Sequence, residues 1–160
     1  MLYGNWSGVT RKLENFQQEL TDNMKDATAQ SAALVESTVL GHLKNQDLPW
    51  QSLKPAYLRW KLHHKGRGSR RLSEKTLIAT GTYFQSITSY IDGLKAFVGI
   101  KRGVAREKDG TDVVNIAAVH ESGSPKNNIP ARPLWEPTFK ETEPKIKKLF
   151  QDKLKDLLKI

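Results

Sequence analysis

The sequence contains no cysteine among its 160 residues. Disulfide bridges, thiol nucleophiles and zinc sites built on thiolates are therefore excluded. A small secreted domain held together by disulfides is disfavoured for the same reason. A chain of this length can bury its own core without such crosslinks. We therefore expect one folded domain that spans residues 1–160.

Long apolar runs are lacking as well. No stretch approaches the roughly 18 consecutive apolar residues that mark a membrane-spanning helix, so we expect no membrane partner. Residues 1–6 (MLYGNW) also lack the basic region and apolar run of a signal peptide. These absences predict a protein that is made and kept in a cytoplasm.

Residue patterns typical of catalysis or metal binding are missing too. His63 and His64 are adjacent, so on a helix their side chains point about 100° apart and cannot easily chelate one metal. We interpret His120-Glu121 as a turn at the end of a strand rather than as an acid–base pair. The segment 65–69 (KGRGS) lacks the Gly-Lys-Ser/Thr ending of a phosphate-binding loop. We therefore expect a protein that is not an enzyme and has no cofactor or bound metal.

Basic residues, by contrast, are in excess, and the formal net charge of +9 indicates an anionic partner or environment. Much of this excess lies between residues 54 and 75, where the only acid is Glu74. Two interpretations stay open for this segment: a solvated loop, or a contact with nucleic acid or an acidic protein. Its bases are Lys54, Arg59, Lys61, Lys65, Arg67, Arg70, Arg71 and Lys75.

A long helix is predicted over residues 8–43, because apolar and small residues recur there at alternating steps of four and three. No proline interrupts this run. Between Ala27 and Thr38 the small residues favour close packing against another element, either the core of the chain or another subunit. The predicted stripe consists of Val9, Leu13, Phe16, Leu20, Met24, Ala27, Ser31, Leu34 and Thr38.

A shorter helix should follow in the basic segment, with Ser52 as its cap and Pro55 in its first turn. Residues 63–72 contain two glycines and show no apolar period, which predicts a loop that only assembly could order. The bases of this loop are the candidate contacts to DNA or to a protein partner: Lys65, Arg67, Arg70 and Arg71.

The pattern changes to that of strands in the region 77–120. Residues 87–91 are strand-like, Asp92-Gly93 is a strong hairpin signal, and 94–100 predicts the returning strand. We expect a third strand over 113–119, with a bend into a helical turn before His120 as the alternative for its end. Three strands in meander order predict an antiparallel sheet with one face available to the long helix.

The last segment predicts a helix over 138–160. Thr138 and Glu141 match a capping box at its start. The fold class expected from all these elements is α+β, with a long N-terminal helix and a C-terminal helix packed on an antiparallel β-sheet. The apolar face of the C-terminal helix is formed by Ile146, Leu149, Phe150, Leu154, Leu157 and Leu158.

Three stretches, taken in order, resemble a known family. Together they are similar to the virion-morphogenesis proteins of tailed phages, also called tail-completion or minor tail proteins, including the Mu-like form. The most specific piece is Pro130-Ala131-Arg132-Pro133. The stretches are 48–53 (LPWQSL) followed by 57–61 (YLRWK), then 77–87 (LIATGTYFQSI), and finally 117–123 (AAVHESG) followed by 129–135 (IPARPLW).

The resemblance implies a structural virion protein at the tail end or the head–tail junction, in the role of tail completion, tail terminator or neck component. It further implies a homo-oligomeric ring, by tail symmetry a hexamer, that meets tail-tube and neck or connector proteins and has DNA in its lumen. Such a protein would be assembled in the cytoplasm of the bacterial host and reside in the virion. The alternative is a basic nucleic-acid-binding module, although neither a helix-turn-helix nor a zinc-finger signature is present.

Arg132 stands between two prolines, which fix the backbone on either side of it. Its planar guanidinium suits a carboxylate or backbone carbonyls on a neighbouring protein. Arg132, Pro133 and Trp135 are therefore candidate residues of a partner interface. An internal brace between this loop and the C-terminal helix is the alternative.

Overall fold

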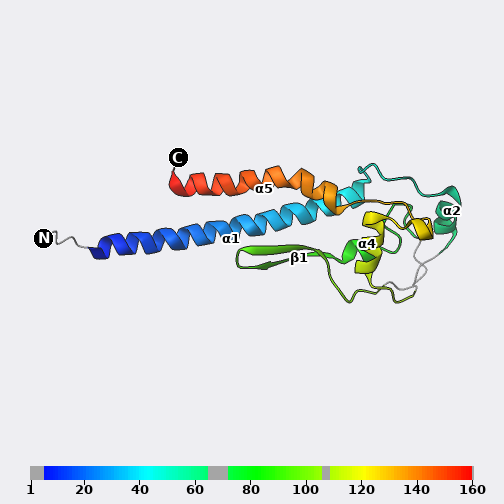
Figure 1. Cartoon of the computed structure of the whole chain (residues 1–160), viewed down its shortest axis with the longest axis horizontal. Helices are drawn as coiled ribbons and strands as arrows, with labels where there is room; N and C mark the ends of the chain where they lie inside the picture. Colours follow the sequence, from blue (N-terminus) through cyan, green and yellow to red (C-terminus); the bar gives the residue numbers. More distant parts are fainter. Residues whose placement is uncertain (1–5, 65–71, 106–108, 160) are drawn as a thin grey trace.

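The structure is a computed structural model, and it describes residues 6–64, 72–105 and 109–159. Helix α1 (Trp6–Asn45) runs along most of an elongated molecule, and helix α5 (Trp135–Leu158) lies beside it in the opposite direction (Figure 1). The remaining elements are α2 (Pro55–His63), α3 (Thr82–Gln85), β1 (Ile87–Asp92), β2 (Lys95–Ile100), α4 (Val113–Ser122) and the short turn η2 (Pro125–Asn127).

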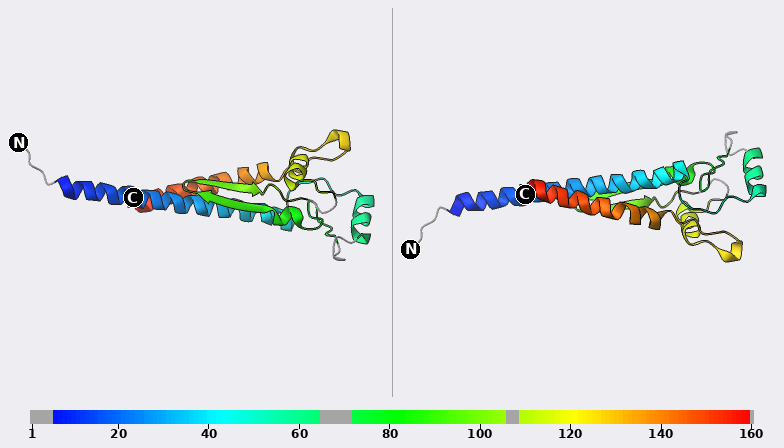
Figure 2. Two further views of the ribbon diagram at one scale, coloured as in Figure 1. Left: turned by 90° about the horizontal axis from the view of Figure 1, so that it is seen from below. Right: turned by 90° about the horizontal axis from the view of Figure 1, so that it is seen from above.

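Two parts of the molecule can be distinguished. The stalk consists of α1, α5 and the β1–β2 hairpin, with α1 between α5 on one side and the hairpin on another (Figure 1). Seen from below, the hairpin lies in front of the two helices (Figure 2). The head consists of residues 46–64, 72–86, 101–105 and 109–134, which gather at the end where α1 finishes and α5 begins (Figure 1). The architecture is α+β, as the sequence predicts.

The helix predicted over 8–43 is confirmed as α1. Its buried residues lie in its second half, where Ala27 and Ser31 leave room for close approach and Val35, Val39 and Leu43 supply apolar contacts. This half packs against α5 and against both strands. The small residues therefore serve the internal packing of the chain.

The hairpin at Asp92-Gly93 is confirmed as well. Strands β1 and β2 pair antiparallel, with Ile87 opposite Ile100 at the base and Asp92 opposite Lys95 next to the turn. Gly93 has a φ of 57°, in the left-handed region that such turns use. The base of the hairpin is buried, whereas residues 90–97 are exposed.

The strand predicted over 113–119 is wrong, because these residues form helix α4. Asp112 caps the helix, since its carboxylate accepts a hydrogen bond of 3.0 Å from the backbone N–H of Val114. Val113 and Ala117, four residues apart, turn their side chains into the core. The buried residues of this apolar run follow the helical period, although its valines favour a strand by composition. The described sheet therefore has two strands.

Two predicted helix caps are also wrong. Helix α5 begins at Trp135 and not at the Thr138–Glu141 capping box, and the hydroxyl of Thr138 donates to the carbonyl of Leu134 at 2.6 Å. Helix α2 has Lys54, not Ser52, at its N-cap, although Pro55 occupies the first turn as expected. Both helices therefore start without a side-chain cap from their own flanking residues.

The buried core lies where the second half of α1 meets the hairpin base, α3, α4 and the segment before α5. It fixes the head on the stalk and so positions the site described next. Its members are Val35, Val39, Leu43, Tyr83, Ile87, Ile100, Val113, Ala117 and Leu134.

Candidate functional site

The segments that carry the family resemblance meet in the head. The backbone N–H of Arg132 donates to the carbonyl of His120 at 2.6 Å, which joins the Pro-Ala-Arg-Pro segment to the end of α4. The indole N–H of Trp50 donates to the carbonyl of Pro133 at 2.7 Å, which joins the same segment to the connector after α1. The segment is thus held from two sides.

Glu121 supplies the cap that α5 lacks in its own sequence. Its carboxylate accepts hydrogen bonds from the backbone N–H groups of Leu134, Trp135 and Glu136 at 2.8–3.2 Å. A carboxylate at a helix N-terminus satisfies unpaired N–H groups and interacts favourably with the helix dipole. The strand-end turn predicted at His120-Glu121 is wrong, because both residues lie in the last turn of α4. The carboxylate of Glu121 joins α4 to the start of α5.

Gly123 allows the chain to turn back against this junction. Its φ of 75° and ψ of 176° lie in a region that is essentially restricted to glycine. A Cβ at this position would lie 2.8 Å from the backbone nitrogen of Ala131. The backbone at 129–131 can therefore approach only because residue 123 has no side chain.

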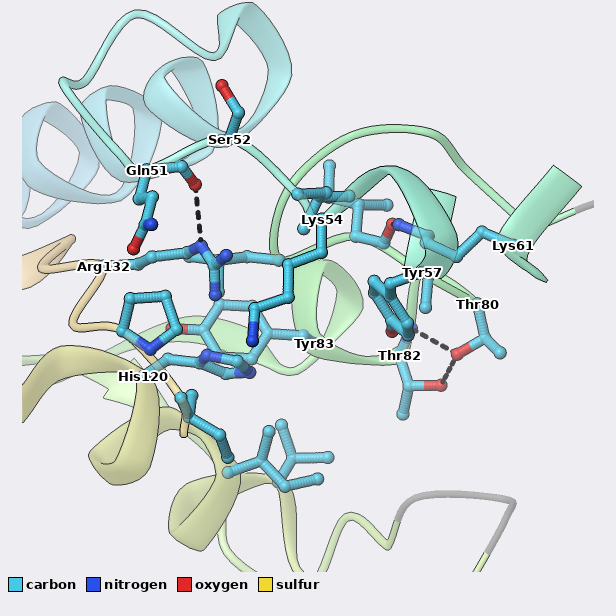
Figure 3. A pocket seen from close by; sticks show the side chains of 18 of the residues that line it. Gln51, Ser52, Lys54, Tyr57, Lys61, Thr80, Thr82, Tyr83, His120 and Arg132 are labelled. Carbon is cyan, nitrogen blue, oxygen red and sulfur yellow. Dashed lines mark hydrogen bonds between the residues drawn. The ribbon is translucent and has the colours of Figure 1, made fainter. Parts of the chain in front are cut away.

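A cavity of about 510 Å³, here called the head cavity, opens beside this junction (Figure 3). It is lined by the connector before α2, by α2, by residues 77–83, by α4 and by residues 128–132. Among the lining residues that the structure describes, none is acidic. The ionisable ones are Lys54, Tyr57, Lys61, Tyr83, His120 and Arg132.

Lys61 is the most deeply buried of the described bases in the 54–75 segment and is only 2% exposed. Its ammonium donates to the carbonyls of Lys75 and Ile78 at 2.8 and 2.9 Å. Burial lowers its pKa to about 8, against the field of Glu74, which raises it. This base therefore holds 75–78 onto α2. The sequence around Lys61 does not indicate these contacts, because the acceptors are backbone carbonyls, which every residue type has.

The burial of Lys61 predicts a stability that depends on pH. The pKa of Lys61 falls from its ordinary 10.5 to about 8 on folding, so above pH 8 the unfolded chain binds more protons there than the folded chain. Stability should therefore rise with pH from about 8. Burial raises the pKa of Tyr83 above its ordinary 10.0, which should reverse the rise above pH 10. Urea unfolding between pH 7.5 and 9.5 measures this slope.

Lys61→Met is the control for this experiment, because it keeps the length of the side chain without a titrating group. The slope between pH 8 and 9.5 should be smaller in the variant than in the wild type. Equal slopes would contradict a depressed pKa at Lys61.

Arg132 is buried in the head, with 7% of its surface exposed. Its Nε donates to the carbonyl of Gln51 at 3.3 Å, and burial lowers its pKa. This contact is a brace within the chain, although it reaches the connector before α2 and not the C-terminal helix of the alternative interpretation. Pro133 and Trp135 are half-buried beside it. Their role in a partner interface stays a prediction, and the candidate loop bases Lys65, Arg67, Arg70 and Arg71 lie outside the described residues.

Large apolar side chains are exposed at several places on the stalk: Phe139, Leu154 and Leu158 on α5, and two patches on α1 and the hairpin. The α1 tip extends beyond the end of α5 and beyond the hairpin turn (Figure 1), and there Trp6 is 70% and Leu13 is 64% exposed. The hairpin patch lies near the β1–β2 turn, where Tyr90 is 66% exposed. The α1 tip comprises Trp6, Val9, Leu13 and Phe16, and the hairpin patch comprises Tyr90, Ile91, Leu94 and Phe97.

In the part of the chain that the structure describes, no three His, Asp or Glu side chains are grouped as a metal site requires. None of the described helices combines the length and apolar character needed to cross a bilayer. No protein-family model, curated protein or solved structure matches the chain.

Proposed function

We propose that this chain is a structural subunit of a tailed-phage virion, placed at the tail end or the head–tail junction, where copies of it form a ring. Two kinds of observation support this. The stretches that resemble the tail-completion proteins are joined in one place by hydrogen bonds. The stalk presents apolar surface that the described chain leaves uncovered.

The α1 tip is the observation that carries the proposal. The predicted apolar stripe continues through Val9, Leu13 and Phe16, yet these side chains are exposed. Near its end α5 is paired to α1 by Lys153 and Asp26, so little of α5 remains to cover the preceding turns of α1. Burying one such side chain contributes about 1.5–3 kcal/mol. A further surface must cover the tip if the stripe is to be buried.

The geometry favours a second copy of the chain as that surface. The α1 tip and the hairpin patch lie on different elements, so a contact between the tip of one copy and the hairpin of the next is heterologous. Heterologous contacts of this kind close into rings when the rotation between copies allows it. We propose six copies in this ring, because the tail symmetry that the resemblance implies is six-fold.

Native mass spectrometry of the full chain tests the proposal. We expect a closed oligomer that the double variant Leu13→Asp, Phe16→Asp converts to a folded monomer, because both residues are exposed and lie outside the core. Its melting temperature should be close to that of the dilute, dissociated wild-type chain, since assembly itself stabilises the folded state. Glu14→Gln, on the same turns but outside the stripe, is the matched control and should leave the ring intact. A wild-type chain that stays monomeric at high concentration, alone and with its tail-tube protein, would refute the ring.

The alternative of a basic nucleic-acid-binding module makes a different prediction for the monomeric double variant. A DNA-binding module would keep its affinity for duplex DNA and lose it steeply with added salt. A ring subunit with DNA in its lumen should lose most of that affinity when the ring is broken. Fluorescence anisotropy with a labelled duplex, at two salt concentrations, distinguishes them.

A further inference from the structure

We propose that the head cavity is a binding site for a carboxylate, carried by an acidic side chain of a partner protein that is flanked by apolar residues. This proposal rests on the residues that line the cavity and does not require that the chain forms a ring. A neighbouring virion protein would be one natural source of such a segment, but any protein with that chemistry fits.

The first step of the argument is uncompensated positive charge. Lys54, Lys61 and Arg132 line one cavity, and among the described residues none of them forms an ion pair with a carboxylate. Lys61 and Arg132 are buried, whereas Lys54 is exposed, and burying a cation without a paired anion is costly. An anionic ligand would supply the partner that the described chain does not.

The second step is the orientation of Arg132. The carbonyl of Gln51 holds its Nε, and the flanking prolines restrict its backbone, so the guanidinium has little freedom. Figure 3 shows the guanidinium and the side chain of Lys54 directed into the cavity, near the ring of Tyr83. The Nε is engaged, and the two terminal nitrogens remain for a bidentate contact, the geometry that matches a carboxylate.

The third step is the character of the walls. Beside its cations and several polar residues the cavity presents a group of aliphatic side chains, which suits the apolar neighbours of an acidic residue rather than a hydrated phosphate backbone. Its volume of about 510 Å³ fits a few side chains, within the range of roughly 300–1,000 Å³ usual for ligand pockets. The aliphatic lining consists of Leu53, Leu77, Ile78, Val113, Ile116, Ile129 and Pro130.

The experiment is a titration of the full ¹⁵N-labelled chain, followed at the arginine Nε–H and tyrosine resonances. The probes are two pools of acetylated, amidated tripeptides, X-Glu-X and X-Gln-X, in which X is Ala, Leu or Phe. We expect saturable shifts at Arg132 and Tyr83 with the Glu pool, and binding at least about ten-fold weaker with the isosteric Gln pool, because a neutral amide replaces the carboxylate and the charge-assisted bidentate contact is lost. This comparison requires no variant.

Inorganic phosphate and oligo(dT) are the competing probes. Equal binding of the Glu and Gln pools would show an apolar pocket without a carboxylate site and would overturn the proposal. Saturation by oligo(dT) at concentrations where the Glu pool is silent would assign the cavity to nucleic acid instead. Silence with all probes would refute the site.

Two variants locate the charge. Arg132→Lys should bind the Glu pool at least about ten-fold more weakly, since an ammonium lacks the planar fork. Lys54 is exposed at the N-cap of α2, so Lys54→Gln should fold normally and bind roughly two- to five-fold more weakly. Unchanged binding in a folded Lys54→Gln chain, together with unchanged binding in Arg132→Lys, would overturn the assignment of these residues.

Discussion

Gly123→Ala is expected to lower the free energy of unfolding by about 3 kcal/mol or more, the sum of backbone strain and a steric clash. The φ of 75° and ψ of 176° are poorly accessible to alanine. The added Cβ would also lie 2.8 Å from the backbone nitrogen of Ala131, an atom that no side-chain rotation can move. For a chain of this size the melting temperature should fall by about 6–12 °C.

Two further glycines provide matched controls for this measurement. Gly93→Ala adds a Cβ in open space at a φ of 57°, so it should cost only the left-handed strain, about 1 kcal/mol. Gly41→Ala lies within α1 with open space around it and should gain about 0.5–1 kcal/mol. If Gly123→Ala costs no more than Gly93→Ala, the close approach of residues 129–131 is not present in solution.

Glu121→Ala is expected to cost about 2–3 kcal/mol of unfolding free energy, since it leaves the N-terminus of α5 without an acceptor. The backbone N–H groups of Leu134, Trp135 and Glu136 all lose their partner. The effect should exceed that of an ordinary cap because one carboxylate connects two helices. Urea unfolding followed by circular dichroism measures it.

Glu136→Ala is the matched control for Glu121→Ala. Glu136 also lies in the first turn of α5, but its carboxylate is exposed, and its ion-pair partner among the described residues is Lys140 at 2.6 Å. Its loss should cost less than about 0.5 kcal/mol. Similar costs for the two variants would show that Glu121 contributes only as a surface charge.

The sequence predicts the elements whose signals are local. The period of α1 and the Asp92-Gly93 turn are contained in short windows, and both are found in the structure. Residues 113–119 were misassigned because β-branched side chains favour strands by composition, whereas burial at Val113 and Ala117 follows the helical period. The start of α5 was missed because its cap lies on another helix.

The candidate site shows the same division. The restricted backbone around Arg132 follows from two prolines in sequence, but its contacts with Gln51 and His120 join residues far apart in the chain. The sequence groups Lys61 with the other bases of its segment, whereas the structure shows that it is buried. Every residue type has a backbone carbonyl, so sequence patterns cannot identify which residues accept these hydrogen bonds.

The first turns of helix α1 should be less stable than its second half. Its second half is packed on two sides, whereas the turns from Trp6 to Phe16 have exposed apolar side chains and depend largely on intrinsic helix propensity. A short unsupported helix is marginal in water, so these turns should exchange their amide hydrogens fastest and be the first proteolytic target of the monomer. Whatever covers the tip must also offset the cost of ordering it, and this would couple the completion of folding to assembly.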